Sequence, residues 1–279
     1  MRVGFDAKRA FFNYTGLGNY SRDCIRILSQ LYYQNKYFLY TPLAQDNKRL
    51  NFIEKSNNIS ICSPKFKIDK LFKSYWRSKN IVKDLLHDDI EIFHGLSHEI
   101  PFGIEKTNIK TVVTIHDLIF IRYPNLFSIF DRNMYYYKFK SSCERADKII
   151  AISEQTKQDI IKFFKIPEEK IEVVYQGCNY IFQKTTTNIS DIITKYKLPK
   201  KFLLYVGSIE ERKNLLTLLK ALILLPKQKL VVIGSGKSYK NKCLKYIRDN
   251  NLENRVIFLS NIPLEDMAVI YKSAEMLVY

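Results

Sequence analysis

The sequence has no run of apolar residues as long as a membrane span and no stretch rich in proline, glycine or serine. Because a spanning helix needs about 20 consecutive apolar residues, we expect none here. Residues 1–6 have the pattern of a strand rather than that of a signal peptide. With 46% hydrophobic and 26% charged residues over 279 positions, the composition is that of a globular protein large enough for two domains.

Cysteine is scarce, and its spacing argues against disulfide-rich and zinc-knuckle proteins. The five thiols belong to Cys24, Cys62, Cys143, Cys178 and Cys243. An odd number of widely scattered cysteines argues against a disulfide framework and against a zinc knuckle. We therefore expect free thiols, as in the cytoplasm, and no metal site.

Acidic residues are few relative to basic ones, 28 against 45, which gives a formal net charge of +17. Such an excess predicts attraction to nucleic acid, to an anionic lipid surface or to phosphorylated substrates. No RNP, KH or zinc-finger pattern accompanies the charge, so nucleic acid is the least supported of the three.

Short apolar runs alternate with helical patterns along the chain, which is typical of an α/β protein with a parallel sheet covered on both faces. The expected strands cover 2–6, 37–40, 59–62, 90–94, 111–115, 148–152, 171–175, 201–207, 230–234, 255–260 and 275–279. The expected helices cover 19–32, 70–86, 128–146, 154–164, 214–225, 239–250 and 264–273. A polar stretch interrupts this rhythm, so we expect a Rossmann-like domain at 1–180, a linker at 181–200 and a second, incomplete Rossmann-like domain at 201–279.

Arg212 and Lys213 stand where the expected strand 201–207 turns into an apolar helix. A helix N-terminus carries partial positive charge, so cations there are unfavourable unless an anion offsets them. One interpretation is that both side chains point into water. The other is a phosphate site, in which a glycine lets the backbone approach and the two cations hold phosphate oxygens.

Two glycine-rich turns partly match phosphate loops. Gly16-Leu-Gly18 follows the first strand but lacks the third glycine of a dinucleotide fingerprint, which argues against an NAD site. Gly234-Ser-Gly-Lys-Ser238 ends like a P-loop, yet Val231 stands where that motif requires glycine. We interpret the second turn as an ordinary connection from strand to helix.

Histidines follow two of the expected strands. His94 and His98 have the i, i+4 spacing of a helical zinc pair, but the surrounding glycine and proline predict a loop, which favours substrate contact over metal binding. His116 and Asp117 end the strand 111–115, and either could bind sugar hydroxyls or move a proton. The alternative is a histidine satisfied by local hydrogen bonds, with Asp117 capping the next turn.

The segment 65–83 is strongly basic and also carries apolar residues near helical spacing. Its cations are Lys65, Lys67, Lys70, Lys73, Arg77, Lys79 and Lys83, with Trp76 among them. A helix that packs on the core and shows a solvated basic face explains this pattern. A helix lying on an anionic membrane surface, with the tryptophan at the interface, explains it as well.

Six of these segments, taken in order, make the chain similar to the retaining glycosyltransferases of family 4, also called group 1, which have the GT-B fold. They are Gly16-Leu-Gly-Asn-Tyr20, Phe93-His-Gly-Leu-Ser-His-Glu-Ile-Pro101, Thr114-Ile-His-Asp-Leu118, Ala146-Asp-Lys-Ile-Ile-Ala-Ile-Ser153, Val173-Val-Tyr-Gln-Gly177 and Tyr205-Val-Gly-Ser-Ile-Glu-Glu-Arg-Lys-Asn214. The resemblance implies two Rossmann-like domains that face a cleft, with the acceptor bound by the first and a nucleotide sugar by the second.

The resemblance also implies roles for individual residues. Arg212 and Lys213 would hold the donor diphosphate without a metal ion, and Gly16 and Gly18 would let the first loop close over it. His116 would contact the donor sugar as the catalytic residue. His94 and Asp117 would lie near the sugar or acceptor, and Leu259 and Ile262 near the nucleotide base. Ser208 stands where many relatives have arginine, and the two-glutamate motif of the family is expected beyond residue 279.

We therefore expect a glycosyltransferase fragment that transfers a hexose, with mannose as a candidate, to a glycan or lipid-linked acceptor in cell-surface polysaccharide synthesis. The expected location is the cytoplasm, at the inner face of the membrane through the segment 65–83. The alternatives are an inactive basic module that binds an anionic membrane or nucleic acid, and a GT-B-like sugar-nucleotide epimerase.

Overall fold

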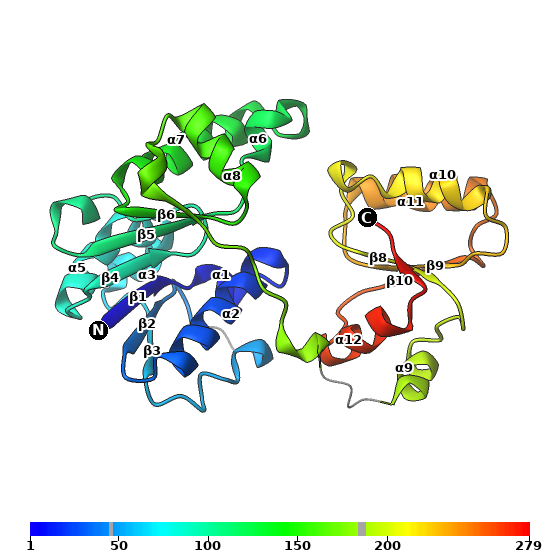
Figure 1. Ribbon diagram of the computed structural model, residues 1–279, viewed down its shortest axis with the longest axis horizontal. Coiled ribbons are helices and arrows are strands. Elements are labelled where there is room, and N and C mark those ends of the chain that lie inside the picture. The colour runs from blue at the N-terminus through cyan, green and yellow to red at the C-terminus, as the bar shows by residue number, and fades with distance from the viewer. Residues whose placement is uncertain (45–46, 184–187) are drawn as a thin grey trace. The chain divides into compact units, whose positions relative to one another are not determined.

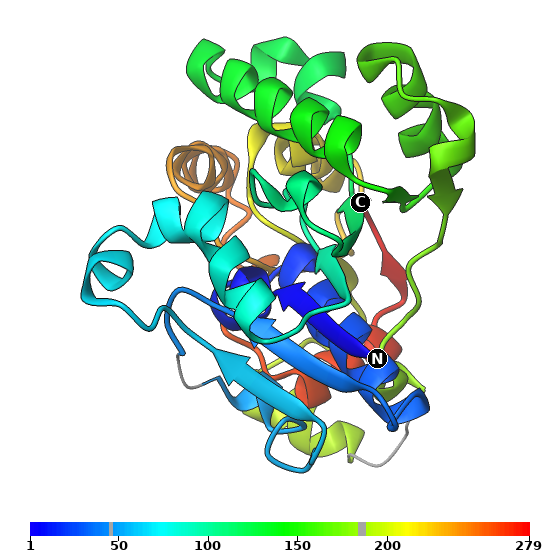
Figure 2. The ribbon, with the colours of Figure 1, turned by 90° about the vertical axis from the view of Figure 1, so that its left-hand side faces the viewer.

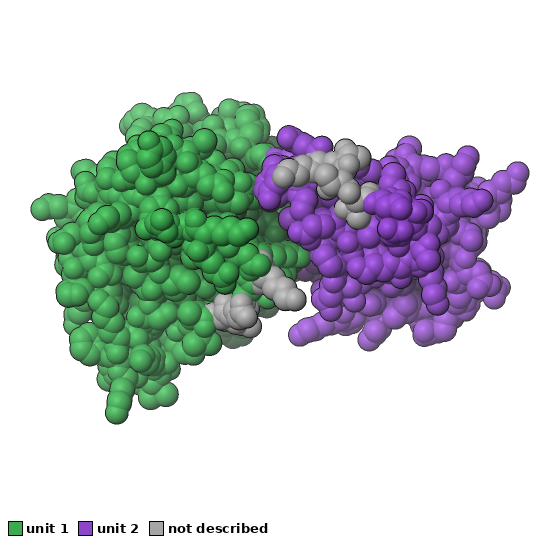
Figure 3. Space-filling model, turned by 90° about the horizontal axis from the view of Figure 1, so that it is seen from below, with its two compact units in different colours: residues 1–177 green, residues 178–279 purple. Residues whose placement is uncertain are grey.

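The computed structural model describes residues 1–44, 47–183 and 188–279, and the chain divides into two compact units, Met1–Gly177 and Cys178–Tyr279. Figure 1 shows the elements of each unit, and Figure 3 colours the two units separately. Each unit is built on its own parallel sheet with helices on both faces. The expected α/β class is confirmed.

The sheet of unit 1 has seven strands in the order β3-β2-β1-β4-β5-β6-β7, and every neighbouring pair is parallel. The strands are β1 (Arg2–Asp6), β2 (Lys36–Tyr40), β3 (Ile59–Cys62), β4 (Ile92–Gly95), β5 (Lys110–Ile115), β6 (Lys148–Ala151) and β7 (Ile171–Val173). The strand order reverses between β1 and β4. In open α/β sheets, ligands bind beyond the carboxyl ends of the strands at such a switch point.

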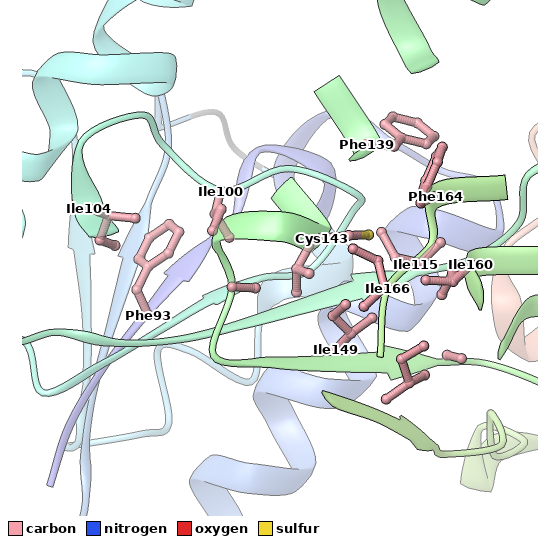
Figure 4. Close-up of a cluster of buried hydrophobic side chains, with 14 of the residues drawn as sticks. Phe93, Ile100, Ile104, Ile115, Phe139, Cys143, Ile149, Ile160, Phe164 and Ile166 are labelled. Carbon is pink, nitrogen blue, oxygen red and sulfur yellow. The ribbon is translucent and has the colours of Figure 1, made fainter. Parts of the chain in front are cut away.

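Helices cover both faces of this sheet. On one face α1 (Lys8–Phe12) and α2 (Gly16–Leu31) pack over β1 and β2. The other face carries α5 (Ile81–His87), α6 (Ile119–Arg122), α7 (Ile129–Arg145) and α8 (Glu154–Asp159). Figure 4 shows the core on that face, where Phe139 and Cys143 of α7 lie above Ile115 and Ile149 of the strands. Ser128 and Ser153 cap α7 and α8 by accepting hydrogen bonds from backbone N–H groups.

The helix expected over 70–86 is interrupted. It consists of α3 (Lys67–Leu71), α4 (Lys73–Tyr75), a π-helical turn at Trp76–Asn80 and α5. The wider turn places Trp76 in the core, where its Nε1 donates to Asp84 Oδ2 at 2.7 Å. The expectation that Trp76 lies at a membrane interface is therefore wrong, because the side chain is 1% exposed.

The sheet of unit 2 has four parallel strands in the order β10-β9-β8-β11. They are β8 (Leu203–Val206), β9 (Leu230–Ile233), β10 (Val256–Leu259) and β11 (Met276–Leu277). One face is covered by α10 (Leu215–Ile223) and α11 (Ser238–Asp249), and the other by α9 (Ile189–Lys195) and α12 (Leu264–Ser273). The strand order again reverses beside the first strand of the unit, between β8 and β11.

Helix α9 lies inside the range 181–200 that the sequence predicts to be a linker, although residues 184–187 of that range lie outside the described residues. Ile192 of α9 and Leu198 after it are buried in the core of unit 2. Their apolar side chains are the physical reason that this part of the chain packs on α12 and is part of unit 2. In the described ranges, no helix combines the length and apolarity needed to cross a bilayer.

Candidate functional site

The carboxyl ends of β4 and β5 bring together the histidines of unit 1. The His94 side chain contacts Thr114, with Nε2 2.8 Å from the threonine Oγ1. The hydroxyl of Tyr20, from α2, lies 3.0 Å from the same Oγ1. Thr114 is buried, so it links His94 of the sheet to Tyr20 of the helix beneath the site. The sequence motif contains both residues, but it gave no reason to connect them.

His116 follows β5 and is 6% exposed. Its Nε2 lies 2.9 Å from the backbone oxygen of Leu96, and its Nδ1 lies 3.1 Å from the amide nitrogen of Gln176. The ring of Tyr20 meets the imidazole edge-on at a centroid distance of 4.8 Å. The expectation of a locally satisfied histidine thus agrees with the geometry, and a role against the donor sugar stays a prediction.

His98 is a third histidine of this cluster. Its ring stacks on Phe139 at 4.2 Å and lies 5.2 Å from the ring of His116. Its backbone has a positive φ of 67°, which is uncommon for a residue other than glycine and often marks functional sites. Its Nδ1 and the neighbouring Ser97 Oγ are buried without a hydrogen-bond partner in the described structure. The sequence marks His98 as a candidate for substrate contact, but its strained backbone and unsatisfied Nδ1 are visible only in the structure.

Burial keeps these histidines neutral. It lowers the pKa of His94 to about 4, with a smaller contribution from His116. The pKa of His98 is likewise lowered well below 6.5 by burial and by His116. For His116, burial also lowers the pKa, while the hydrogen bond to Leu96 and the charge of Asp117 oppose the shift. At neutral pH the cluster therefore offers uncharged rings rather than imidazolium cations.

Asp117 is exposed, and its Oδ1 accepts a hydrogen bond from the backbone N–H of Ile119 at 3.2 Å. This is the capping role that the sequence left open beside a role in binding. Within the described ranges, no three His, Cys, Asp or Glu side chains are grouped so that they could hold a metal ion.

The two glycines in the first turn of α2 have different environments. A Cβ on Gly18 would lie 1.8 Å from the backbone oxygen of Asn13, so only glycine fits there. The N–H of Gly18 donates to Asn13 Oδ1 at 3.2 Å. A Cβ on Gly16 would have no neighbour within 4 Å. Gly18 is thus explained by packing inside the unit, whereas Gly16 leaves its backbone open to an approaching group.

Arg212 and Lys213 lie in a 3-10 turn, Glu211–Lys213, at the carboxyl edge of the sheet of unit 2. Asn214, in the left-handed conformation with φ 52°, separates this turn from α10. Arg212 Nε lies 2.9 Å from Glu210 Oε2, and Lys213 Nζ lies 4.1 Å from the centre of the Tyr279 ring. The two cations therefore precede the helix, and carboxylate and aromatic neighbours compensate their charge.

The loop Gly234-Ser-Gly236 packs directly against the loop after β8. A Cβ on Gly234 would lie 1.9 Å from the oxygen of Gly207, and one on Gly236 would lie 2.4 Å from the oxygen of Ile209. Ile209 N donates to Ser235 O at 2.8 Å. These glycines are needed for loop packing, which supports the interpretation of an ordinary turn. They also fix the loop that carries Arg212 and Lys213.

The residues expected near the base lie at the end of β10 and in the turn that follows it. Ile262 is buried among core side chains, and Leu259 packs against the same cluster. The oxygen of Leu259 accepts a hydrogen bond from Gly234 N. The side chain of Ile262 is therefore unavailable to a base, whereas Ser260 and Asn261 of the same turn are exposed.

A surface formed by α3 and α4 exposes large apolar side chains between lysines. We call it the α3–α4 patch, and its apolar members are Phe66, Ile68, Leu71, Phe72 and Tyr75. Leu71 is 76% exposed. Lys67, Lys70 and Lys73 alternate with these residues. The segment lies at the left edge of the view in Figure 2.

Comparison with known proteins shows two family models matching the chain. "Glycosyltransferase Family 4" matches residues 14–180, and "Glycosyl transferases group 1" matches residues 188–279. The O-antigen chain mannosyltransferase B of Escherichia coli is 28% identical over 197 residues, which are 67% of this chain and 50% of that protein. The O-antigen chain mannosyltransferase RfbU of Salmonella typhimurium is 24% identical over 207 residues, 74% of this chain and 53% of that protein. The chain thus spans about half the length of these relatives.

Solved structures share the fold of this chain at low sequence identity. Anabaena HepE in complex with UDP-glucose gives a TM-score of 0.71 at 16% identity, covering 99% of this chain and 72% of that protein. Sucrose-phosphate synthase of Thermosynechococcus elongatus gives 0.74 at 16% identity, covering 99% of this chain and 74% of that protein. The GT-B fold is therefore confirmed.

Proposed function

Because this chain belongs to the family 4, group 1 glycosyltransferases, we propose that it transfers a hexose from a nucleotide-sugar donor to a glycan or lipid-linked acceptor. Mannose is the first candidate sugar, since the relatives matched over about two thirds or more of this chain include O-antigen mannosyltransferases. We place the acceptor in cell-surface polysaccharide synthesis for the same reason.

The observation that carries this proposal is the turn with Arg212 and Lys213 at the carboxyl edge of the sheet of unit 2. A diphosphate leaving group gains negative charge as its bond to the sugar breaks, and two cations held at the sheet edge stabilise that charge. The partners in the free protein, Glu210 and the Tyr279 ring, give way readily because Arg212 and Glu210 are both partly exposed. On this basis the transfer needs no metal ion.

In unit 1 the histidine cluster supplies neutral, preorganised rings at the carboxyl ends of β4 and β5, where we place the acceptor. His116 contacts the donor sugar in this proposal, with Gly16 letting the first loop approach the diphosphate. Neutral imidazoles suit contact with sugar hydroxyls and avoid a buried cation opposite a developing oxocarbenium centre. Transfer proceeds with retention of configuration, and NMR of the anomeric proton of the product tests that outcome.

Titration with GDP, GDP-mannose, UDP and UDP-glucose tests the diphosphate site directly. The double variant Arg212→Ala/Lys213→Ala is expected to weaken binding at least about tenfold, as for the loss of a charge-assisted contact. Lys237→Ala is the matched control, because Lys237 is an exposed cation in the neighbouring loop. Equal affinities for wild type and the double variant would overturn the assignment.

We also propose that the protein works at the inner, cytoplasmic face of a membrane and docks through the α3–α4 patch. Its five exposed apolar side chains provide area for insertion between lipids, and the alternating lysines attract anionic headgroups. A lipid-linked acceptor would be reached from this position. Trp76 takes no part, because it is buried.

An epimerase or an inactive binding module is less well supported. The UDP-N-acetylglucosamine 2-epimerase of Rickettsia bellii shares the fold at 11% identity, with a TM-score of 0.55. Incubation with a nucleotide sugar and no acceptor separates these possibilities. Epimerised donor would indicate the first, and binding without any product in the presence of acceptors would indicate the second.

A further inference from the structure

The two ring nitrogens of His116 have different partners. Nε2 lies 2.9 Å from the backbone oxygen of Leu96, and a carbonyl oxygen can only accept. Nε2 therefore carries the proton. In a neutral imidazole the other nitrogen is then an acceptor, and the amide nitrogen of Gln176 lies 3.1 Å from it as a donor. The pair of contacts selects one tautomer.

The orientation of the Gln176 amide and the charge of the ring are linked. If the amide turned over, its oxygen would face Nδ1, and that atom would need a proton of its own to donate. Both nitrogens would then be protonated, which makes the ring a cation. His116 is 6% exposed, so such a cation would be strongly disfavoured by burial.

Other neighbours hold the plane of the ring but do not choose its tautomer. Tyr20 of α2 and His98 of the loop after β4 contact the ring through their own aromatic faces or edges. The charged groups that act on it are Asp117, which favours protonation, and Arg9, which opposes it. Among the described contacts of His116, Gln176 supplies the hydrogen bond to Nδ1.

From this geometry we propose that Gln176 is a positioning residue, which fixes His116 as the neutral tautomer with the proton on Nε2. The inference rests on the proposed function only for the use of His116 in transfer. It also means that neither ring nitrogen is free to exchange a proton with substrate while both contacts persist. His116 then serves as a preorganised polar surface and not as a general acid or base.

Gln176 is well placed for a test because its own side chain is exposed. It follows β7 and stands directly before Gly177, the last residue of unit 1. Replacing it leaves the hydrophobic core of the unit intact. Loss of the fold is therefore not the expected result of a substitution.

The decisive measurement is the ¹⁵N NMR spectrum of the imidazoles in protein labelled only at its four histidines, without nucleotide. Long-range ¹H–¹⁵N correlations distinguish the two neutral tautomers and the cation, and His116→Asn identifies the signal of His116. Wild type is expected to show the proton on Nε2. Gln176→Glu is expected to protonate Nδ1 as well and to move the titration midpoint of His116 upward, because a carboxylate accepts from Nδ1 and favours the cation.

Gln176→Leu is expected to remove the hydrogen-bond donor to Nδ1 without adding charge. Nδ1 then becomes accessible to protons, so the titration midpoint of His116 also rises, by less than in Gln176→Glu. Gln158→Glu is the control, since Gln158 is exposed on α8 and adds the same charge. The proposal is overturned if both Gln176 variants keep the nitrogen shifts and midpoint of wild type, or if Gln158→Glu produces the same change.

Kinetics separate this inference from the proposed function. With a nucleotide-sugar donor, Gln176→Leu is expected to lower kcat while the KM for the donor stays within about twofold, and Gln176→Asn to restore part of the rate. Absence of transfer by wild type with an altered NMR spectrum in Gln176→Glu would defeat the proposed function alone. Normal transfer and unchanged spectra in both variants would defeat the positioning role alone.

Discussion

Arg77 and Asp6 form a bidentate ion pair. The guanidinium Nε lies 3.1 and 3.0 Å from the two carboxylate oxygens, and Nη2 donates to Asp6 Oδ2. The side chains are 14% and 6% exposed. Arg77 belongs to the π-helical turn, and Asp6 ends β1 at the switch point of the sheet. Glu99 accepts from a third guanidinium nitrogen at 3.2 Å. The interrupted helix is thereby joined to the carboxyl edge of the sheet.

Replacing Arg77 by methionine is expected to destabilise unit 1 by about 3 kcal/mol, because Asp6 stays buried without a counter-charge. Urea unfolding followed by tyrosine and tryptophan fluorescence measures the change. The double variant Asp6→Asn/Arg77→Met should lose less than the two single losses added together. Lys65→Met is the control, since Lys65 is half exposed and 3.5 Å from Asp88, and it should cost less than about 1 kcal/mol.

Acid should destabilise unit 1 before its carboxylates titrate. The pKa of His94 is about 4 in the folded chain because of burial, and 6.5 is the ordinary value, so the unfolded chain binds more protons between these values. The contribution is present above pH 6.5 and is lost as the pH falls toward 4. His94→Gln is expected to remove ~2 kcal/mol of the pH dependence between pH 6.5 and 4.5.

His87→Gln is the matched control, because His87 is exposed at the end of α5. Unfolding free energies from urea titrations at several pH values give both slopes. A slope for His94→Gln equal to that of His87→Gln would show that the buried histidine is not the source.

Alanine at the two glycines in the first turn of α2 should separate packing from ligand approach. Gly18→Ala is expected to lower the stability of unit 1 by about 1–3 kcal/mol, because the new Cβ meets the oxygen of Asn13 at 1.8 Å. Gly16→Ala should leave stability unchanged and weaken donor binding. Thermal unfolding and nucleotide titration of both variants provide the comparison. If Gly16→Ala binds the donor like wild type, Gly16 has no role at the diphosphate.

The loop Gly234-Ser-Gly236 of unit 2 allows a similar test of packing. Gly236→Ala is expected to displace the loop at Ile209, since its Cβ would lie 2.4 Å from that backbone oxygen. Donor affinity should fall although no phosphate ligand is removed. Hydrogen exchange of the amides of 207–213 measures the displacement. Unchanged exchange together with reduced affinity would instead mean that the Gly236 backbone meets the ligand itself.

Membrane docking predicts that Leu71→Ser/Phe72→Ser reduces binding to vesicles containing phosphatidylglycerol by about tenfold or more. Ile129→Ser/Phe130→Ser is the control, because these residues are similarly exposed on α7, with Phe130 at 88%. Cosedimentation at low and high salt reports both the apolar and the ionic contribution. Equal losses in the two variants would remove the α3–α4 patch as the specific docking surface.

The sequence predicts most strands well and the contacts of the site poorly. The strands Arg2–Asp6 and Ile59–Cys62 have the bounds that their short apolar runs predict. The helix over 70–86 fails because Trp76 and Arg77 are adjacent and both turn inward, which the π-helical turn allows and a 3.6-residue period does not. Periodicity carries no information on partners such as Asp6.

The sequence does not predict contacts between segments that are far apart in the chain. Gln176 lies 60 positions from His116, and only the parallel order of β5, β6 and β7 brings their ends to one edge. The motifs around both residues were recognisable, yet no local pattern predicts their hydrogen bond. By contrast, the position of Arg212 and Lys213 at a sheet edge follows from the strand pattern alone.

Each unit contains a fully buried cysteine whose rate of chemical modification can report the opening of that unit. Cys143 in unit 1 and Cys243 in unit 2 are both fully buried, while Cys178 is exposed. A thiol reagent reaches a buried cysteine only when the surrounding structure opens. Burial also raises the pKa of Cys143 to about 12, so the folded thiol is poorly reactive as well as shielded. The modification rates of these two cysteines therefore report the opening of each unit separately, in one sample of the unaltered chain.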